Sequence, residues 1–273
     1  MSPTGALAVA IYPSLQNKTV FVSGGSSGIG AELVKCFAAQ GARVAFCGTK
    51  AGGGDALMAE IEQLGDAQAR PQTQPYYEAC DVRDVSAVQA LLERVAERFG
   101  PVQVLVNNAG RDDRHSLDEL TPEYWDNCLN LNLRHHVFAT QTVARQLRAA
   151  KLPGSIINMG SISWMRGRPN LIGYTTSKAA ISGMTRSLAR ELGEDGIRVN
   201  ALVPGAIVTA RQSTLWRNPE EDQKFIDLQC LKYRLEAGHV ARPTLFLASD
   251  DSDGITGQSL IVDAGLAQVS VVG

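Results

Sequence analysis

TVFVSGGSSGIG, residues 19–30, places a short β-rich run directly before a glycine-rich turn. Apolar residues at helical spacing follow as far as Ala38, so the order is strand, glycine turn, helix. Glycines let the backbone turn tightly and let a pyrophosphate approach the helix N-terminus, where free N–H groups and the helix dipole favour anions. The stretch indicates a nucleotide-binding unit. Because loops are generally rich in glycine and serine, its context has to support that interpretation.

Outward from this unit, β-rich runs alternate with helical patterns along the chain. Apolar runs occupy residues 42–47, 76–82, 102–106, 155–159, 196–203 and 255–263. The amphipathic helix expected at residues 85–99 ends at Gly100-Pro101, which is a stop signal. The alternation predicts an α/β fold, a Rossmann-like doubly wound sheet of seven parallel strands with helices on both faces. Pro243 lies inside a helix expected to begin near His239, although a proline inside a helix removes a backbone hydrogen bond and bends the chain.

Composition predicts one domain and a small-molecule partner. The chain has 273 residues, 44% of them hydrophobic, and no composition shift divides it. We expect an N-terminal arm at residues 1–16, a domain at 17–266 with a substrate lid at about 206–237, and a tail at 267–273. The net charge of -2 and the scattered basic residues argue against nucleic acid and anionic membranes as partners.

The cysteines and the apolar runs of the sequence bear on the cellular compartment and on metal binding. Five scattered cysteines without a CxxC pair argue against a disulfide framework and a zinc site, and they suit a reducing, cytoplasmic location. The apolar patch at residues 6–11 has no basic residue before it, which makes it a poor signal peptide, and no run is long enough to span a bilayer.

The stretch at residues 155–178 carries the candidate chemistry. A buried run ends at Met159, Ser161 follows it, and a helical pattern then contains Tyr174 and Lys178. Residues four apart share a helix face, so the Lys178 ammonium is expected to lie near the Tyr174 phenol and to lower its pKa. A tyrosine needs such help to act as a base near neutral pH. Since this spacing is common on helices by chance, the pair gains weight only from the glycine turn before it.

Gly48-Thr49-Lys50 bears on cofactor choice. In dinucleotide-binding folds an acidic residue at the end of the second strand holds the ribose 2′-hydroxyl, and a basic residue suits a 2′-phosphate. Gly48 occupies the acidic position and Lys50 is nearby. This favours NADP and leaves NAD open, because Lys50 is equally well interpreted as a solvated loop residue before Gly52.

Further motifs occur in a recognisable order: the glycine turn, the NNAG turn at residues 107–110, Asn132, the Ser161–Tyr174–Lys178 set, and Pro204-Gly205. In this order they resemble the short-chain dehydrogenase/reductase superfamily over roughly residues 16–266. The resemblance implies that Asn132, Ser161, Tyr174 and Lys178 are catalytic and that Asp81 contacts adenine. It also implies a homotetramer. The cofactor-binding residues implied are Gly24, Ser26, Ser27, Gly28, Ile29, Gly30, Gly48, Thr49, Lys50, Asp81, Val82, Asn108, Ala109, Gly110, Tyr174, Lys178, Pro204, Gly205, Ile207 and Thr209.

A narrower resemblance concerns the substrate. Segments such as residues 112–115, 160–164 and 229–232 are similar to bacterial aldose 1-dehydrogenases of the D-xylose dehydrogenase type, although members of that type carry an aspartate where this chain has Gly48 and use NAD. The flat face of Trp164 suits a pyranose ring, and Trp216 is a second such residue. The expected substrate residues are Ser161, Ser163, Trp164, Tyr174, Gln212, Asp112 and Arg114.

The leading hypothesis is oxidation of C1 of an aldose of the pentose or 6-deoxyhexose class, such as D-xylose, L-arabinose or L-fucose, with Tyr174 as base and NADP or NAD as cofactor. One alternative keeps the enzyme and changes the substrate to a keto-deoxy sugar acid, another secondary alcohol or a 3-oxoacyl thioester. Arg111, Arg114, Arg166 and Arg168 keep an acidic substrate open. The other alternative is a non-catalytic nucleotide sensor, against which both Tyr174 and Lys178 argue.

Overall fold

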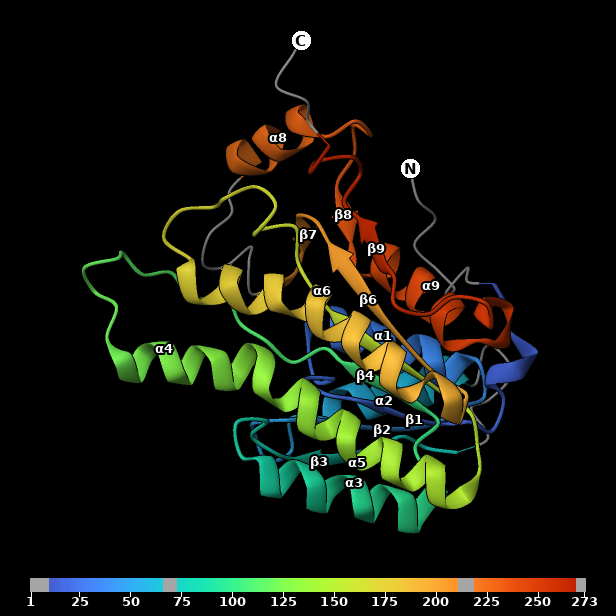
Figure 1. The fold of residues 1–273 in the computed structure, drawn as a ribbon. Coiled ribbons are helices and arrows are strands. Elements are labelled where there is room, and N and C mark those ends of the chain that lie inside the picture. The colour runs from blue at the N-terminus through green and yellow to red at the C-terminus, as the bar shows by residue number, and fades with distance from the viewer. Residues whose placement is uncertain (1–9, 66–72, 211–218, 269–273) are drawn as a thin grey trace.

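Seven parallel strands form the centre of the computed structural model, which describes residues 10–65, 73–210 and 219–268 (Figure 1). The strand order is β3-β2-β1-β4-β5-β6-β9, and every neighbouring pair is parallel. The sheet confirms the predicted Rossmann-like architecture. Its strands are β1 (Thr19–Val22), β2 (Arg43–Gly48), β3 (Tyr76–Ala79), β4 (Val104–Asn107), β5 (Gly154–Met159), β6 (Ile197–Pro204) and β9 (Ser259–Val262).

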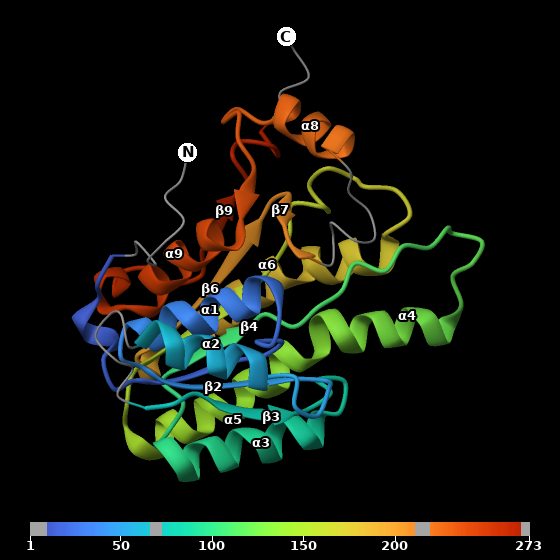
Figure 2. The same ribbon diagram turned by 180° about the vertical axis from the view of Figure 1, so that it is seen from behind.

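Helices cover both faces of this sheet (Figures 1 and 2). One face packs against α1 (Gly28–Ala39), α2 (Asp55–Gly65) and α9 (Ala237–Ala248). The other packs against α3 (Val85–Phe99), α5 (His135–Ala150) and α6 (Ile172–Leu192). Because both faces are covered, central strands such as β1 and β4 are buried at every residue.

The side of the sheet on which successive strands are added changes between β1 and β4. The strands after β1 are added on one side and the strands from β4 on the other. In folds of this type ligands bind beyond the carboxyl ends of the strands at this switch point. The loops after β1, β4, β5 and β6 are therefore expected to meet in one site.

Smaller elements lie above that edge of the sheet. The two-stranded pair β7 (Ile207–Val208) and β8 (Leu235–Glu236), with α8 (Pro219–Leu228), forms the described part of the expected lid. On the side of α6, α4 (Pro122–Leu129) continues through a π-helical turn, η2 (Asn130–Arg134), into α5. Helix α9 does contain Pro243, as its sequence indicated.

The beginning of the domain differs from the expected boundary. Residues 10–16 were expected to belong to an arm, but the 3-10 helix η1 (Pro13–Leu15) packs onto the domain and Leu15 is fully buried. The backbone N–H of Tyr12 donates to Gln40 Oε1 at 2.7 Å. One buried leucine among polar neighbours carries no periodic signal, which is why the sequence did not indicate this contact.

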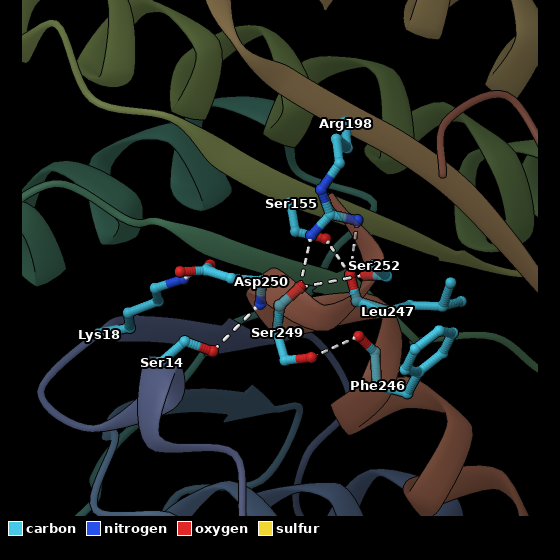
Figure 3. A network of polar contacts seen from close by, with 9 residues as sticks. All are labelled: Ser14, Lys18, Ser155, Arg198, Phe246, Leu247, Ser249, Asp250 and Ser252. Carbon is cyan, nitrogen blue, oxygen red and sulfur yellow. Dashed lines mark hydrogen bonds and ion pairs between the residues drawn. The ribbon is translucent and has the colours of Figure 1, made fainter. Parts of the chain in front are cut away.

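A polar network ties this N-terminal segment to the end of α9 and to β6 (Figure 3). The Arg198 guanidinium on β6 donates to the carbonyls of Leu247 at 2.9 Å and Ser249 at 3.0 Å. Lys18 pairs with Asp250 at 2.6 Å, and the backbone N–H of Asp250 donates to Ser14 Oγ at 3.1 Å. Carbonyls at a helix C-terminus lack hydrogen-bond donors within the helix. Arg198, on β6, provides donors for two of these carbonyls.

Candidate active site

A cavity of about 520 Å³ opens at the carboxyl ends of the central strands. The glycine turn after β1 lines it together with the loops after β2, β4, β5 and β6, the first turns of α6, and α8. Parallel pairing brings these loops together, because it places the ends of all the strands at one edge. The site therefore combines segments that are about 240 residues apart in the sequence, from Gly24 to Leu266.

The glycine turn is held by the NNAG turn after β4. The Ser23 hydroxyl accepts hydrogen bonds from the backbone N–H groups of Asn108 and Ala109, each at 3.0 Å. The Asn108 side chain donates to the carbonyls of Ser23 at 3.0 Å and Gly24 at 3.1 Å. Ser23, which stands where the superfamily usually has threonine, thus makes the bridging contacts of a hydroxyl at that position.

The glycines of the turn fit close approach by a phosphate group. Gly24 has φ +64, and a Cβ there would lie 2.9 Å from Ala109 Cα. Gly28 also has a positive φ, +57, and opens α1, whose N-cap residue Ser27 makes no side-chain capping bond. The first N–H groups of α1 are therefore left to bind an anion. The residues present fit a dinucleotide whose pyrophosphate lies at this helix N-terminus.

The three residues expected to perform the chemistry line the same cavity. Ser161 follows β5, and Tyr174 and Lys178 lie one turn apart on α6. The Lys178 ammonium is buried, donates to the Met159 carbonyl at 2.8 Å, and lies 5.7 Å from the centroid of the Tyr174 ring. The Ser161 hydroxyl is 2.9 Å from the Ser163 hydroxyl. A substrate oxygen beside Tyr174 would thus meet two serine hydroxyls and one phenol.

The pKa values of this set differ from the expectation. Loss of solvent raises the pKa of Tyr174 to about 12, and its hydrogen bond with Ser161 offsets part of that rise. Burial lowers the pKa of Lys178 to about 8. The expected lowering of the tyrosine pKa by Lys178 is therefore not seen, because desolvation of the phenol outweighs the attraction of an ammonium bound to a carbonyl.

Asn132 lies behind this set, outside the cavity wall. Its Oδ1 accepts from the backbone N–H of Arg111 at 2.7 Å, and its Nδ2 donates to the Cys128 carbonyl at 3.0 Å within the π-helical turn. A Cβ at Gly110 would lie 2.9 Å from Asn132 Oδ1 and 3.2 Å from Lys178 Nζ. Asn132 and Lys178 thus converge on the end of the NNAG turn, which requires a glycine.

Most of the predicted site residues line the cavity. Besides the catalytic three, they are Gly24, Ser26, Ser27, Gly28, Ile29, Gly30, Gly48, Thr49, Val82, Asn108, Ala109, Gly110, Asp112, Arg114, Ser163, Pro204, Gly205, Ile207 and Thr209.

Besides Asn132, three predicted residues of the described part of the chain do not line the cavity. Asp81 forms a bidentate ion pair with Arg83, and Lys50 is exposed on the loop after β2. Trp164 is half-buried outside the cavity lining, and its Nε1 has no hydrogen-bond partner among the described residues. Gln212, like Trp216, lies outside the described residues. Stacking of Trp164 on a sugar is therefore not supported by this structure.

Some lining residues were not predicted as site residues. Arg166 and Arg168 come from the loop after β5, Glu221 and Phe225 from α8, and Leu266 from the segment after β9. The arginines were noted only as a nearby basic group. The lid expected at residues 206–237 includes α8, but the sequence does not show which face of this helix meets the cavity. The spacing of Glu221 and Phe225, four apart on one helix face, is a signal only once the orientation of α8 is known.

Two further features concern metal ions and membranes. In the part of the chain that the structure describes, no group of three or more His, Cys, Asp or Glu side chains is arranged to hold a metal ion. Over the same residues, no helix has the length and apolar character needed to cross a membrane.

Comparison with known proteins identifies the family. A family model described as enoyl-(acyl carrier protein) reductase matches residues 24–267. The chain is 46% identical to a D-xylose 1-dehydrogenase of Caulobacter vibrioides, over 95% of this chain and 99% of that protein. It is 45% identical to a probable galactose dehydrogenase of Rhizobium meliloti, over 93% of this chain and 97% of that protein. The chain is a short-chain dehydrogenase/reductase.

A solved structure agrees with this assignment. A metagenomic blue fluorescent protein in complex with NADPH superimposes on this dehydrogenase/reductase with a TM-score of 0.80 and 36% identity, over 93% of this chain and 99% of that one. The protein is thus an oxidoreductase of CH–OH groups whose family uses NAD or NADP. Its similarity to sugar dehydrogenases extends over nearly the whole chain.

Proposed function

We propose that this short-chain dehydrogenase/reductase oxidises C1 of a cyclic aldose to the corresponding lactone. The observation that carries the proposal is the convergence of Ser161, Tyr174 and Lys178 on one cavity with the glycine turn. Similarity to proteins named as dehydrogenases of xylose and galactose supports an aldose as substrate. In the reaction C1 loses a hydride and its hydroxyl loses a proton, which leaves the lactone carbonyl.

Side chains of the protein remove the proton of the C1 hydroxyl. Tyr174 accepts the proton of the C1 hydroxyl, and the Ser161 hydroxyl, bonded to Ser163, orients that oxygen. Lys178, held by the Met159 carbonyl, presents a positive charge below the phenol. NADP or NAD, when bound, supplies the hydride acceptor and a further positive charge. Positioned general base catalysis of this kind contributes about a hundred- to ten-thousand-fold to the rate.

The cofactor proposed is NADP, with NAD as the competing choice. The end of β2 carries Gly48, and a Cβ there would meet the Ser26 hydroxyl. No carboxylate therefore occupies the position that would repel a 2′-phosphate, while the hydroxyls of Ser26 and Thr49 line the cavity there. An NADPH complex of a protein with the same fold and 36% identity supports this choice.

The test is the initial rate of cofactor reduction by a panel of sugars, measured with NADP and with NAD. The panel contains D-xylose, L-arabinose, D-galactose, L-fucose, D-glucose and D-glucuronate. Reduction of either cofactor, with formation of a lactone, is the expected result. If the protein binds cofactor but no aldose of the panel reduces it, the substrate assignment is wrong.

A further inference from the structure

The outer end of the cavity is rich in arginine. Arg114, Arg166 and Arg168 line the main cavity, and a second hollow of about 320 Å³ adjoins it. The two hollows share Arg166 and Arg168, and the second adds Lys224. The second hollow contains neither the glycine turn nor the catalytic three. The shared arginines therefore lie at the end of the cavity that is away from the reacting atoms.

Asp112 and Glu221 attract the Arg168 guanidinium electrostatically, but neither forms an ion pair with it. Arg111 also lines the cavity, but it pairs with Asp113 at 2.5 Å. Glu221 pairs with Lys224 at 2.7 Å, which is the main cause of its lowered pKa. Among the described residues, no carboxylate lies within ion-pair distance of the guanidinium of Arg166 or Arg168.

Both arginines are half-buried rather than extended into solvent. The Arg168 guanidinium lies 5.5 Å from the centroid of the Phe225 ring on α8. Burial lowers the pKa of Arg168, repulsion by Arg114 and Arg166 lowers it further, and the carboxylates of Asp112 and Glu221 offset only part of this lowering. Partly buried guanidinium groups that lie close together repel one another, and a bound anion would relieve this repulsion.

We propose that the substrate is an anionic aldose, with a carboxylate or phosphate on the carbon farthest from C1 that Arg166 and Arg168 hold, assisted by Arg114. The proposal rests on the proposed oxidation of an aldose at C1 and narrows its substrate class. The planar guanidinium fork of arginine matches both carboxylate and phosphate oxygens in bidentate geometry. The relatives' names refer to neutral sugars, so this specificity would distinguish the present chain from them.

Matched sugars test the anion directly. D-glucuronate differs from D-xylose only by the carboxylate on C5, and D-glucose 6-phosphate differs from D-glucose only by the phosphate. We expect kcat/KM for the anionic member of at least one pair to exceed that of its neutral partner by about tenfold to a hundredfold, the range for hydrogen bonds to a charged group. The pair with the larger ratio identifies the anion as carboxylate or phosphate.

Substitution of Arg166 and Arg168 tests whether these two residues cause the preference for anionic sugars. In the double variant Arg166→Gln/Arg168→Gln the anionic-to-neutral ratio of kcat/KM should fall by about tenfold or more, through KM rather than kcat. Arg190→Gln, an exposed change on α6 outside both hollows, should leave the ratio unchanged. The double variant's circular dichroism and cofactor affinity report whether it folds. If it does not, Arg166→Lys and Arg168→Lys replace it, each expected to lose part of the ratio.

The outcomes separate this inference from the proposed function. Neutral aldoses oxidised at least as well as their anionic partners would overturn the inference and leave the aldose assignment in place. An anionic preference that survives intact in the folded double variant would overturn the role of the two arginines. Failure to oxidise any sugar, neutral or anionic, while cofactor still binds, would overturn the proposed function and this inference with it.

Discussion

Tyr174 holds its proton more tightly than a free tyrosine does. Its pKa of about 12 reflects desolvation, and the Lys178 pKa of about 8 reflects burial of an ammonium. The residue expected to be the base is thus protonated at neutral pH, and its deprotonation must be coupled to binding of positive charge beside it. Removal of the Tyr174 hydroxyl and variation of pH both test its role as base.

Tyr174→Phe should bind cofactor almost normally and lose turnover by about a hundred- to ten-thousand-fold, because the general base is gone and the ring remains. The measurement is kcat together with cofactor affinity by fluorescence titration. Tyr124→Phe is the matched control, since the Tyr124 hydroxyl donates to the Asp113 carbonyl outside the cavity wall. Turnover of the Tyr174 variant equal to that of the wild type would remove Tyr174 from the mechanism.

The pH dependence has a defined sign. The tyrosinate fraction rises about tenfold per pH unit below the raised pKa, so sugar oxidation should accelerate between about pH 6 and 8. Above about pH 8 the rise should flatten, because Lys178 then loses the charge that favours tyrosinate. Lactone reduction needs protonated Tyr174, which predominates throughout this pH range, so its rate should be nearly independent of pH. Profiles of kcat/KM in both directions test this, and oxidation that slows over the lower interval contradicts it.

At the scale of elements, the structure shows how distant segments support one another. Arg198 on β6 bonds the carbonyls at the end of α9, which also receive the Ser155 hydroxyl at 2.7 Å (Figure 3). Helix α9 in turn packs on the face of the sheet that carries α1, whose N-terminus borders the cavity. The cap of α9 therefore contributes to the rigidity of the nucleotide-binding side.

Arg198→Met should lower the free energy of unfolding by about 1–3 kcal/mol, because it removes the hydrogen bonds that a charged guanidinium donates to the carbonyls of Leu247 and Ser249. Chemical denaturation followed by circular dichroism measures this, with the exposed Arg190→Met as control, expected to change stability by less than about 0.5 kcal/mol. Equal midpoints for the two variants would show that the bonds to α9 add nothing to stability.

The elements themselves were largely predictable from sequence. Strand and helix patterns are local, and so are the glycine turn, the NNAG turn and the Tyr174–Lys178 spacing, because each depends on neighbours in the chain. The placement of α8 over the cavity, the contact of Arg198 with α9 and the packing of Leu15 depend on tertiary partners. Asp81 illustrates the limit, since the sequence predicts a contact with adenine but does not show that the Asp81 carboxylate pairs with Arg83 two residues away.

At the scale of the whole molecule, one parallel sheet explains why the proposed site forms at one edge. It brings the N-terminus of α1, the proposed base Tyr174 and several arginines into the lining of one cavity. A tetramer, which the resemblance to the superfamily implies, remains a prediction. Function depends on this convergence more than on any single motif, because each motif alone occurs in many unrelated loops and helices.

The most direct test of the central claim follows the hydrogen at C1. D-xylose and D-glucuronate deuterated at C1 are incubated with the enzyme and NADP or NAD, and the reduced cofactor is examined by mass spectrometry. If C1 is the carbon oxidised, the reduced cofactor carries the deuterium and the sugar product is an unlabelled lactone. Reduced cofactor without deuterium, with the label retained in the oxidised sugar, would show that the hydride comes from another carbon and would contradict oxidation at C1.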